Sequence, residues 1–201
     1  MFRANVRKGR VRSPLLVAAL MGAATPVLLP ATQADAAPRG RVCLFQNQQG
    51  ANGAGHVAWA LRDPHNSAHW LWGSTDSINS APKIDAGRRN GSWIQGGTWK
   101  EMRGEARGKK KPIGLRTYDY YRCINTAGGN LAAAQKTYKH IRGNGYALLN
   151  NNCLTKALEI FRSYSSALTG AHLPSGQFKS PNYYFTTSLN KSRGWEKARV
   201  Y

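Results

Sequence analysis

The chain has 201 residues and carries 29 Lys or Arg against 9 Asp or Glu, which gives a formal net charge of +20. A length of this order predicts a single domain, and the apolar runs are too short to cross a bilayer, which argues against a protein built around a transmembrane helix. The positive charge favours anionic partners, although it can also simply keep a secreted protein soluble.

The first 36 residues have the pattern of a secretory signal peptide. Five basic residues lie between positions 3 and 12, and apolar stretches follow at 15–24 and 27–29. Ala34 and Ala36 then flank Asp35, a pattern that a signal peptidase cuts after. We expect cleavage near Ala36–Ala37, secretion, and a single mature domain over 37–201. Without the five basic residues and one acid of 1–36, that domain keeps 24 basic and 8 acidic residues and a charge of +16.

The first strand expected in the mature chain covers 41–46 and holds Cys43 within the stretch RVCLF. Because an exported chain meets oxidising conditions, its cysteines are expected to pair, and one of the three is left over. The partner we favour for Cys43 is Cys123, which lies in a second strand candidate at 115–123. A different pairing, or no bridge at all, stays open.

A hairpin is predicted at 56–61 and 68–73, after the glycine-rich stretch QQGANGAG. His56 opens its first strand, and the second strand can place beside it a group that orients the imidazole. His69 is the best candidate for that group, and Ser67 is the alternative. The stretch HNSAH also permits a His-Asn-His nuclease interpretation, but that chemistry needs a metal finger with wider spacing.

The stretch from 74 to 114 is expected to be a long irregular excursion over the surface, because glycines and charges dominate it. Trp93 and Trp99 lie within it and are candidates for a wall of a ligand site. A helix is then predicted at about 129–142, ending at Gly143.

The next helix begins at Cys153 and is predicted to run to about 166. Apolar residues recur along it at intervals of three and four, namely Leu154, Ala157, Leu158, Phe161 and Tyr164. Asn150, Asn151 and Asn152 supply cap residues before it. A cysteine in a first turn meets backbone N–H groups and the positive end of the helix dipole, which stabilise a thiolate and can hold an oxyanion. The alternative is a buried structural cysteine or a disulfide partner.

The rest of the chain contains one further histidine that is a candidate for a general base, and one predicted short helix. His172 follows Cys153 by nineteen residues, but the stretch GAHLPSG around it is typical of a loop. Ser180 and Pro181 predict a short helix near the C-terminus. No cysteine pair has zinc spacing and no glycine-rich phosphate loop precedes a helix, so we expect neither a metal ion nor another cofactor.

The stretches GHVAWAL and YALLNNNCLTKAL together resemble the circularly permuted NlpC/P60 branch of the papain-like fold, which includes the lecithin retinol acyltransferase-like proteins. In that branch the histidine strand comes first and the Asn-Cys helix last, as here. The resemblance implies an α+β fold, a small antiparallel sheet packed on helices with the cysteine at the start of its helix. It implies Cys153 as nucleophile, His56 as base and His69 as the third group. Tyr146 and Asn152 also match the branch and are assigned to the substrate site.

The sequence therefore predicts a secreted cysteine hydrolase, an amidase or peptidase acting on amide or ester bonds, with acyl transfer left open. Cell-wall peptide is the expected substrate, because secretion and positive charge both fit an anionic wall, and a lipid amide or ester comes next. The expected partners are anionic wall polymer or peptidoglycan peptide, then a membrane surface, with nucleic acid least favoured. We expect a monomer. The alternatives are a non-enzymatic basic binding protein and a secreted nuclease.

Overall fold

The computed structural model describes residues 39–106 and 118–200, all of which fall in one compact unit. The signal peptide predicted at 1–36 and its cleavage site lie outside these residues. Within the two described ranges, no helix has the length and apolar character needed to span a bilayer.

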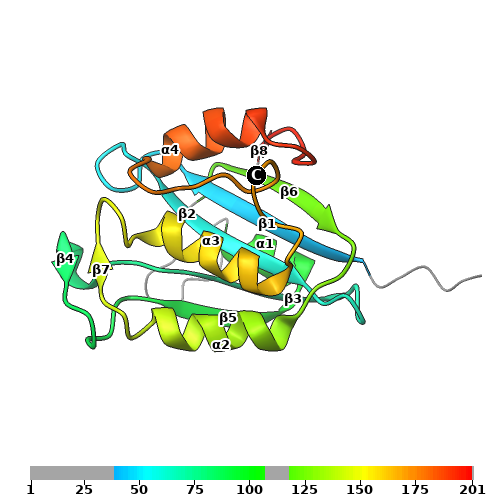
Figure 1. Cartoon of the computed structure of the whole chain (residues 1–201), viewed down its shortest axis with the longest axis horizontal. Helices are drawn as coiled ribbons and strands as arrows, with labels where there is room; N and C mark the ends of the chain where they lie inside the picture. Colours follow the sequence, from blue (N-terminus) through cyan, green and yellow to red (C-terminus); the bar gives the residue numbers. More distant parts are fainter. Residues whose placement is uncertain (1–38, 107–117, 201) are drawn as a thin grey trace, which may run out of the picture. The chain divides into compact units, whose positions relative to one another are not determined.

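An antiparallel sheet of six strands, in the order β5-β3-β2-β1-β6-β8, forms the centre of the fold (Figure 1). The strands are β1 (Gly40–Asn47), β2 (His56–Arg62), β3 (His69–Ser74), β5 (Trp93–Thr98), β6 (Tyr120–Thr126) and β8 (Arg199–Val200). A separate pair joins β4 (Lys83–Ile84) to β7 (Tyr146–Ala147). The first strand and the hairpin are confirmed. Of the strand predicted at 115–123, residues 115–117 lie outside the described ranges, and β6 begins at Tyr120 and ends three residues later than predicted.

The helices confirm the α+β class. They are α1 (Trp99–Ala106), α2 (Leu131–Ile141), α3 (Cys153–Tyr164) and α4 (Pro181–Tyr183). A π-turn, η2 (Tyr184–Ser188), and a 3-10 turn, η3 (Leu189–Lys191), continue α4, and another 3-10 turn, η1 (Ile78–Ser80), follows β3. The helices expected at 129–142, from Cys153 and after Ser180 are thus present.

Strand alternation divides the core between the two faces of the sheet. Val42 and Leu44 of β1 belong to a core shared with α2, α3 and η2, whereas Cys43 and Phe45 belong to a second core that contains Met102 of α1. Helix α3 is buried along nearly its whole length because the sheet packs on one side of it and α2 on another. This packing fixes where the first turn of α3 lies relative to β2 (Figure 1).

The stretch 74–114 is more ordered than expected, as far as it is described. Strand β5 pairs with β3 in a register that runs from His69 opposite Thr98 to Ser74 opposite Trp93, and α1 follows directly. The two glycines of WIQGGT hide this strand from a sequence pattern, because pairing with β3 rather than local propensity stabilises it. Residues 107–114 lie outside the described ranges.

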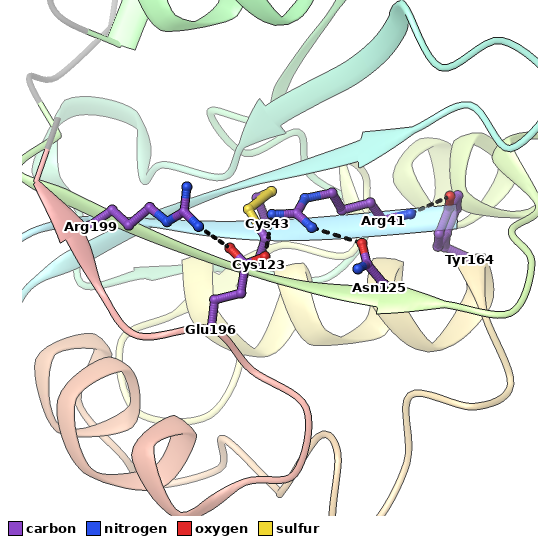
Figure 2. Close-up of a disulfide and its surroundings, with 7 residues drawn as sticks. All are labelled: Arg41, Cys43, Cys123, Asn125, Tyr164, Glu196 and Arg199. Atoms are coloured by element: carbon purple, nitrogen blue, oxygen red, sulfur yellow. Dashed lines mark hydrogen bonds and ion pairs between the residues drawn. A yellow bond between two sulfur atoms is a disulfide. The ribbon is translucent and has the colours of Figure 1, made fainter. Parts of the chain in front are cut away.

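The Cys43–Cys123 disulfide is confirmed, and Cys153 is not part of a disulfide. The two bridged cysteines are directly opposite each other on β1 and β6, and both are fully buried. Beside the bridge, the Arg41 side chain donates to Asn125 Oδ1 and Glu196 Oε1, at 2.7 and 2.6 Å (Figure 2). A disulfide of this kind is consistent with an extracellular protein.

The bridge closes a long loop, which leads to a prediction about stability. The bridged residues are 80 positions apart, and constraining a loop of that length in the unfolded chain stabilises the fold by about 4 kcal/mol. We expect the Cys43→Ala/Cys123→Ala variant to lose free energy of unfolding of this order in urea titrations at pH 7, and reduced wild type to behave alike. Equal unfolding midpoints for oxidised and reduced protein would contradict the prediction.

Candidate functional site

One cavity of about 170 Å³ brings together four of the residues selected from the sequence. Its lining includes His56, the first residue of β2, and Cys153, the first residue of α3, together with Tyr146 and Asn152. The segment from Phe178 to Pro181, which ends at the first residue of α4, forms another wall. In Figure 1 the elements around this cavity, β7, the start of α3 and α4, lie toward the left of the view. Cys153 and His56 are each only 4% exposed, and His56 also lines a second cavity, of about 440 Å³, together with Asp76.

Asn152 determines where α3 begins. Its Oδ1 accepts hydrogen bonds from the amides of Leu154 and Thr155 at 3.0 and 3.1 Å, and its own amide donates to Thr155 Oγ1 at 2.9 Å, which completes a capping box. Its Nδ2 donates to the carbonyl of Leu148 at 2.6 Å. The side chain assigned to substrate binding is thus engaged as a helix cap that holds Cys153 in the first helical position.

The cap also limits which backbone amides of the first helical turn could stabilise an oxyanion. The amides of Leu154 and Thr155 point at Asn152 Oδ1, so they are not aimed at a substrate. An oxyanion that forms on a carbonyl oxygen when the sulfur attacks would need other donors, and the candidates are the first-turn amide of Cys153 and a donor from the opposite wall of the cavity. Lys179 and Ser180 supply the polar side chains of that wall.

The imidazole of His56 is held by a short chain of hydrogen bonds. Its Nε2 lies 2.8 Å from Ser74 Oγ and 3.4 Å from Asp76 Oδ1. The hydroxyl of Ser74 donates its single hydrogen to the carbonyl of Val57 at 2.9 Å. With that hydrogen on Val57, Ser74 Oγ accepts from His56, and the Asp76 carboxylate beside the same nitrogen also favours a proton on Nε2. In the neutral imidazole this leaves the lone pair on Nδ1, and Nδ1 is the nitrogen able to accept a proton.

His69, expected to orient His56, does not reach it. The β2–β3 register pairs Ala58 with Ser74, so the residues nearest His56 are at the end of β3 and just beyond it. His69 is at the opposite end of β3, where its Nδ1 lies 3.7 Å from Asp63 Oδ2. The alternative, Ser67, is exposed in the hairpin turn. Ser74 and Asp76 occupy the place that the sequence analysis gave to His69.

Asn182 of α4, which the sequence analysis did not single out, fixes the loop that carries His56. Its Nδ2 donates to the carbonyls of Gln48 and Gly53, and its Oδ1 accepts from Gln46 Nε2 at 2.7 Å. Gly55, next to His56, has φ +95, and a Cβ there would lie 2.3 Å from Asn182 Oδ1. A glycine is therefore required at this position. In the sequence, the only indication near Asn182 is the pair Ser180 and Pro181, which predicts a helix start.

Lys156 lies one turn along α3 from the cap and has no exposed surface. Its Nζ donates to the carbonyl of Ile141 at 3.1 Å and to Asn144 Oδ1. The lysine therefore ties α3 to the end of α2 and to the segment that leads into β7. Burial lowers the pKa of Lys156 to about 8, although Glu159 nearby raises it.

The two tryptophans expected to form a ligand wall lie elsewhere. Trp93 and Trp99 pack against the second core, on the face of the sheet that carries Phe45, and neither lines the cavity of Cys153. The Trp99 ring packs against Trp70 at 4.6 Å between centroids. The aromatic rings of Trp93 and Trp99 pack against other core side chains, which is the more common role of such residues.

The remaining histidine candidates do not approach Cys153. His172 lines a different cavity, beside Ile124 and Glu196, and its Nδ1 lies 3.0 Å from the carbonyl of Arg193. His65 and His69 lie in and beside the hairpin turn. Among residues 39–106 and 118–200, no three His, Cys, Asp or Glu side chains are grouped as they would be to hold a metal ion.

The chain was compared with protein-family models, with curated proteins and with solved structures, and none of them matches it.

The buried lysine gives a prediction about pH. Above pH 8 the folded protein loses the Lys156 proton, whereas the unfolded chain keeps it until about pH 10.5. The unfolded state then binds more protons, so stability rises with pH. We expect this group to add about 2 kcal/mol to the free energy of unfolding between pH 8 and pH 10.

The variant Lys156→Met should lack this increase. Chemical denaturation of both proteins at pH 8, 9 and 10 measures the difference in slope, which removes contributions that the two share, such as tyrosine titration. Parallel pH profiles for wild type and variant would contradict the assignment.

Proposed function

We propose that this chain is a secreted cysteine hydrolase of the permuted NlpC/P60 type, with Cys153 as nucleophile and His56 as general base. The observation that supports it most is that a cysteine at a helix start and a histidine with an assigned tautomer line one cavity, although 97 positions separate them in the chain. A nucleophile, a base and a group that orients the base are the three parts that covalent acyl chemistry needs.

In the proposed reaction, His56 Nδ1 takes the proton of the Cys153 thiol before substrate binds, and the resulting thiolate attacks an amide or ester carbonyl carbon. Ser74 and Asp76, at Nε2, stabilise the imidazolium that forms and keep the ring oriented. The Cys153 amide stabilises the tetrahedral oxyanion. The imidazolium then protonates the departing amine or alcohol, and water, activated by the same histidine, hydrolyses the thioester and restores the thiol.

Two substrate classes remain, and different observations favour them. The charge of +16 that remains after the predicted cleavage, and the predicted secretion itself, support a cell-wall peptide, because the wall is anionic. The cavity walls support an acyl group with apolar character, because Tyr146, Leu148, Leu149, Phe178 and Pro181 form much of the lining. A lipid amide or ester is therefore the second candidate, and transfer to an acceptor other than water stays open.

The proposal predicts a covalent intermediate. Wild type should hydrolyse p-nitrophenyl butyrate, and acid quenching during turnover should show by mass spectrometry a butyryl adduct on the peptide that contains Cys153. Cys153→Ala should reduce the rate by at least about 10³-fold and abolish the adduct. An unchanged rate in this variant would exclude the proposal and leave a non-enzymatic binding protein as the better account.

The orienting residues can be tested against the residue that the sequence favoured. Asp76→Asn and Ser74→Ala should each lower kcat by roughly 10- to 10⁴-fold, because the imidazolium loses its partner at Nε2. The matched control His69→Asn removes a half-exposed imidazole at the other end of β3 and should leave kcat unchanged. Loss of activity in His69→Asn, with Asp76→Asn unaffected, would reverse the assignment.

A further inference from the structure

Two leucines occupy the tip of a turn at the mouth of the cavity. The backbones of Ala147 and Asn151 exchange two hydrogen bonds of 2.9 Å, which close a tight turn around Leu148 and Leu149. The two side chains are 47% and 68% exposed. Turn tips usually carry glycine, asparagine, aspartate or serine, so adjacent exposed leucines need an explanation other than the turn itself.

Phe178, across the same mouth, is unusual in a different way. Its φ is +55, a left-handed conformation that is costly for a bulky residue. Its side chain is 74% exposed, so core packing does not compensate for the conformation. Its amide donates to the carbonyl of Leu149 at 3.3 Å, which ties the two segments together. We call Leu148, Leu149 and Phe178, which all line the cavity, the apolar rim.

Two lysines and one aspartate lie beside the apolar rim. Lys179 follows Phe178 directly and lines the cavity, and its Nζ lies 3.3 Å from Ser188 Oγ. Lys83 is paired across strands with Ala147, next to the leucine turn, and its exposed ammonium lies 3.2 Å from Asp85. With the excess of basic residues in the whole chain, this combination matches an anionic surface that also accepts apolar side chains.

We infer that the apolar rim docks this protein on an anionic lipid bilayer. The leucine turn and Phe178 enter the boundary between headgroups and acyl chains, while Lys179 and Lys83 stay at the level of the lipid phosphates. Side chains at protruding turn tips can each insert between the lipids of a fluid bilayer. The excess positive charge of the protein is attracted to the negative surface charge of the bilayer without requiring specific ion pairs. The cavity that contains Cys153 then opens toward the bilayer. Docking itself does not require the proposed reaction.

The test is co-sedimentation of the oxidised chain with vesicles, either phosphatidylcholine alone or phosphatidylcholine with phosphatidylglycerol at 3:1, in 0.15 M salt. We expect partitioning onto the anionic vesicles. The double variant Leu149→Asn/Phe178→Asn should weaken it at least about tenfold, because two large apolar groups are lost while the charge is unchanged. Asparagine tolerates positive φ, so the fold is kept at 178. Val200→Asn is the matched control, because Val200 is 73% exposed and does not line the cavity.

Three results would overturn the inference. The first is equal binding by wild type and the double variant, since charge alone would then account for attachment. The second is failure of wild type to bind anionic vesicles. The third is a wild-type dimer in sedimentation velocity that the double variant abolishes, which would show that a second copy covers the rim. The Cys153→Ala variant keeps the apolar rim and should bind vesicles like wild type. Vesicle binding therefore tests the docking inference independently of the proposed hydrolase activity.

Discussion

The packing of α3 against the sheet is the constraint on which the candidate site depends. Helix α3 is buried between the sheet and α2, so its axis has little freedom. The capping box then fixes its first residue, and Lys156 ties its first turns to the end of α2. Cys153 is therefore held at the end of the sheet where β2 begins. The packing of the core around α3 therefore sets the position of the Cys153 sulfur, and a change in this packing would move the sulfur relative to His56.

The other half of the site depends on the register of one hairpin. Ser74 donates to Val57 and lies beside His56 Nε2 together with Asp76, and this arrangement favours the tautomer with the proton on Nε2. The Ser74 hydroxyl thus connects the register of the β2–β3 hairpin with the position of the proton on His56. Asn182 contributes from the opposite side by holding the loop before β2. Segments far apart in the chain cooperate here, which is typical of sites built on a rigid scaffold.

The sequence predicted those features that local patterns encode. Short apolar runs bounded by turn residues located β1 to β3, the apolar stripe and the asparagines located α3, and the strand setting of two of the three cysteines led to the Cys43–Cys123 bridge. The error at His69 came from the register of the hairpin. In an antiparallel pair the start of β2 faces the end of β3, so His56 lies near Ser74 and Asp76, whereas His69 at the start of β3 lies at the far end. Trp93 was misplaced because β5 is specified by its pairing with β3, and Trp99 because it opens α1, which follows β5 directly and packs on the second core.

The central claim is that His56 maintains Cys153 as a reactive thiolate. The most direct measurement is the rate of iodoacetamide labelling of Cys153 in the oxidised protein as a function of pH, in wild type and in His56→Ala. The account predicts labelling at pH 6.5 that is at least about tenfold faster in wild type, with the two rates converging near pH 10 because the thiolate is the nucleophile. Identical profiles in the two proteins, or a Cys153 that resists labelling at every pH, would contradict it.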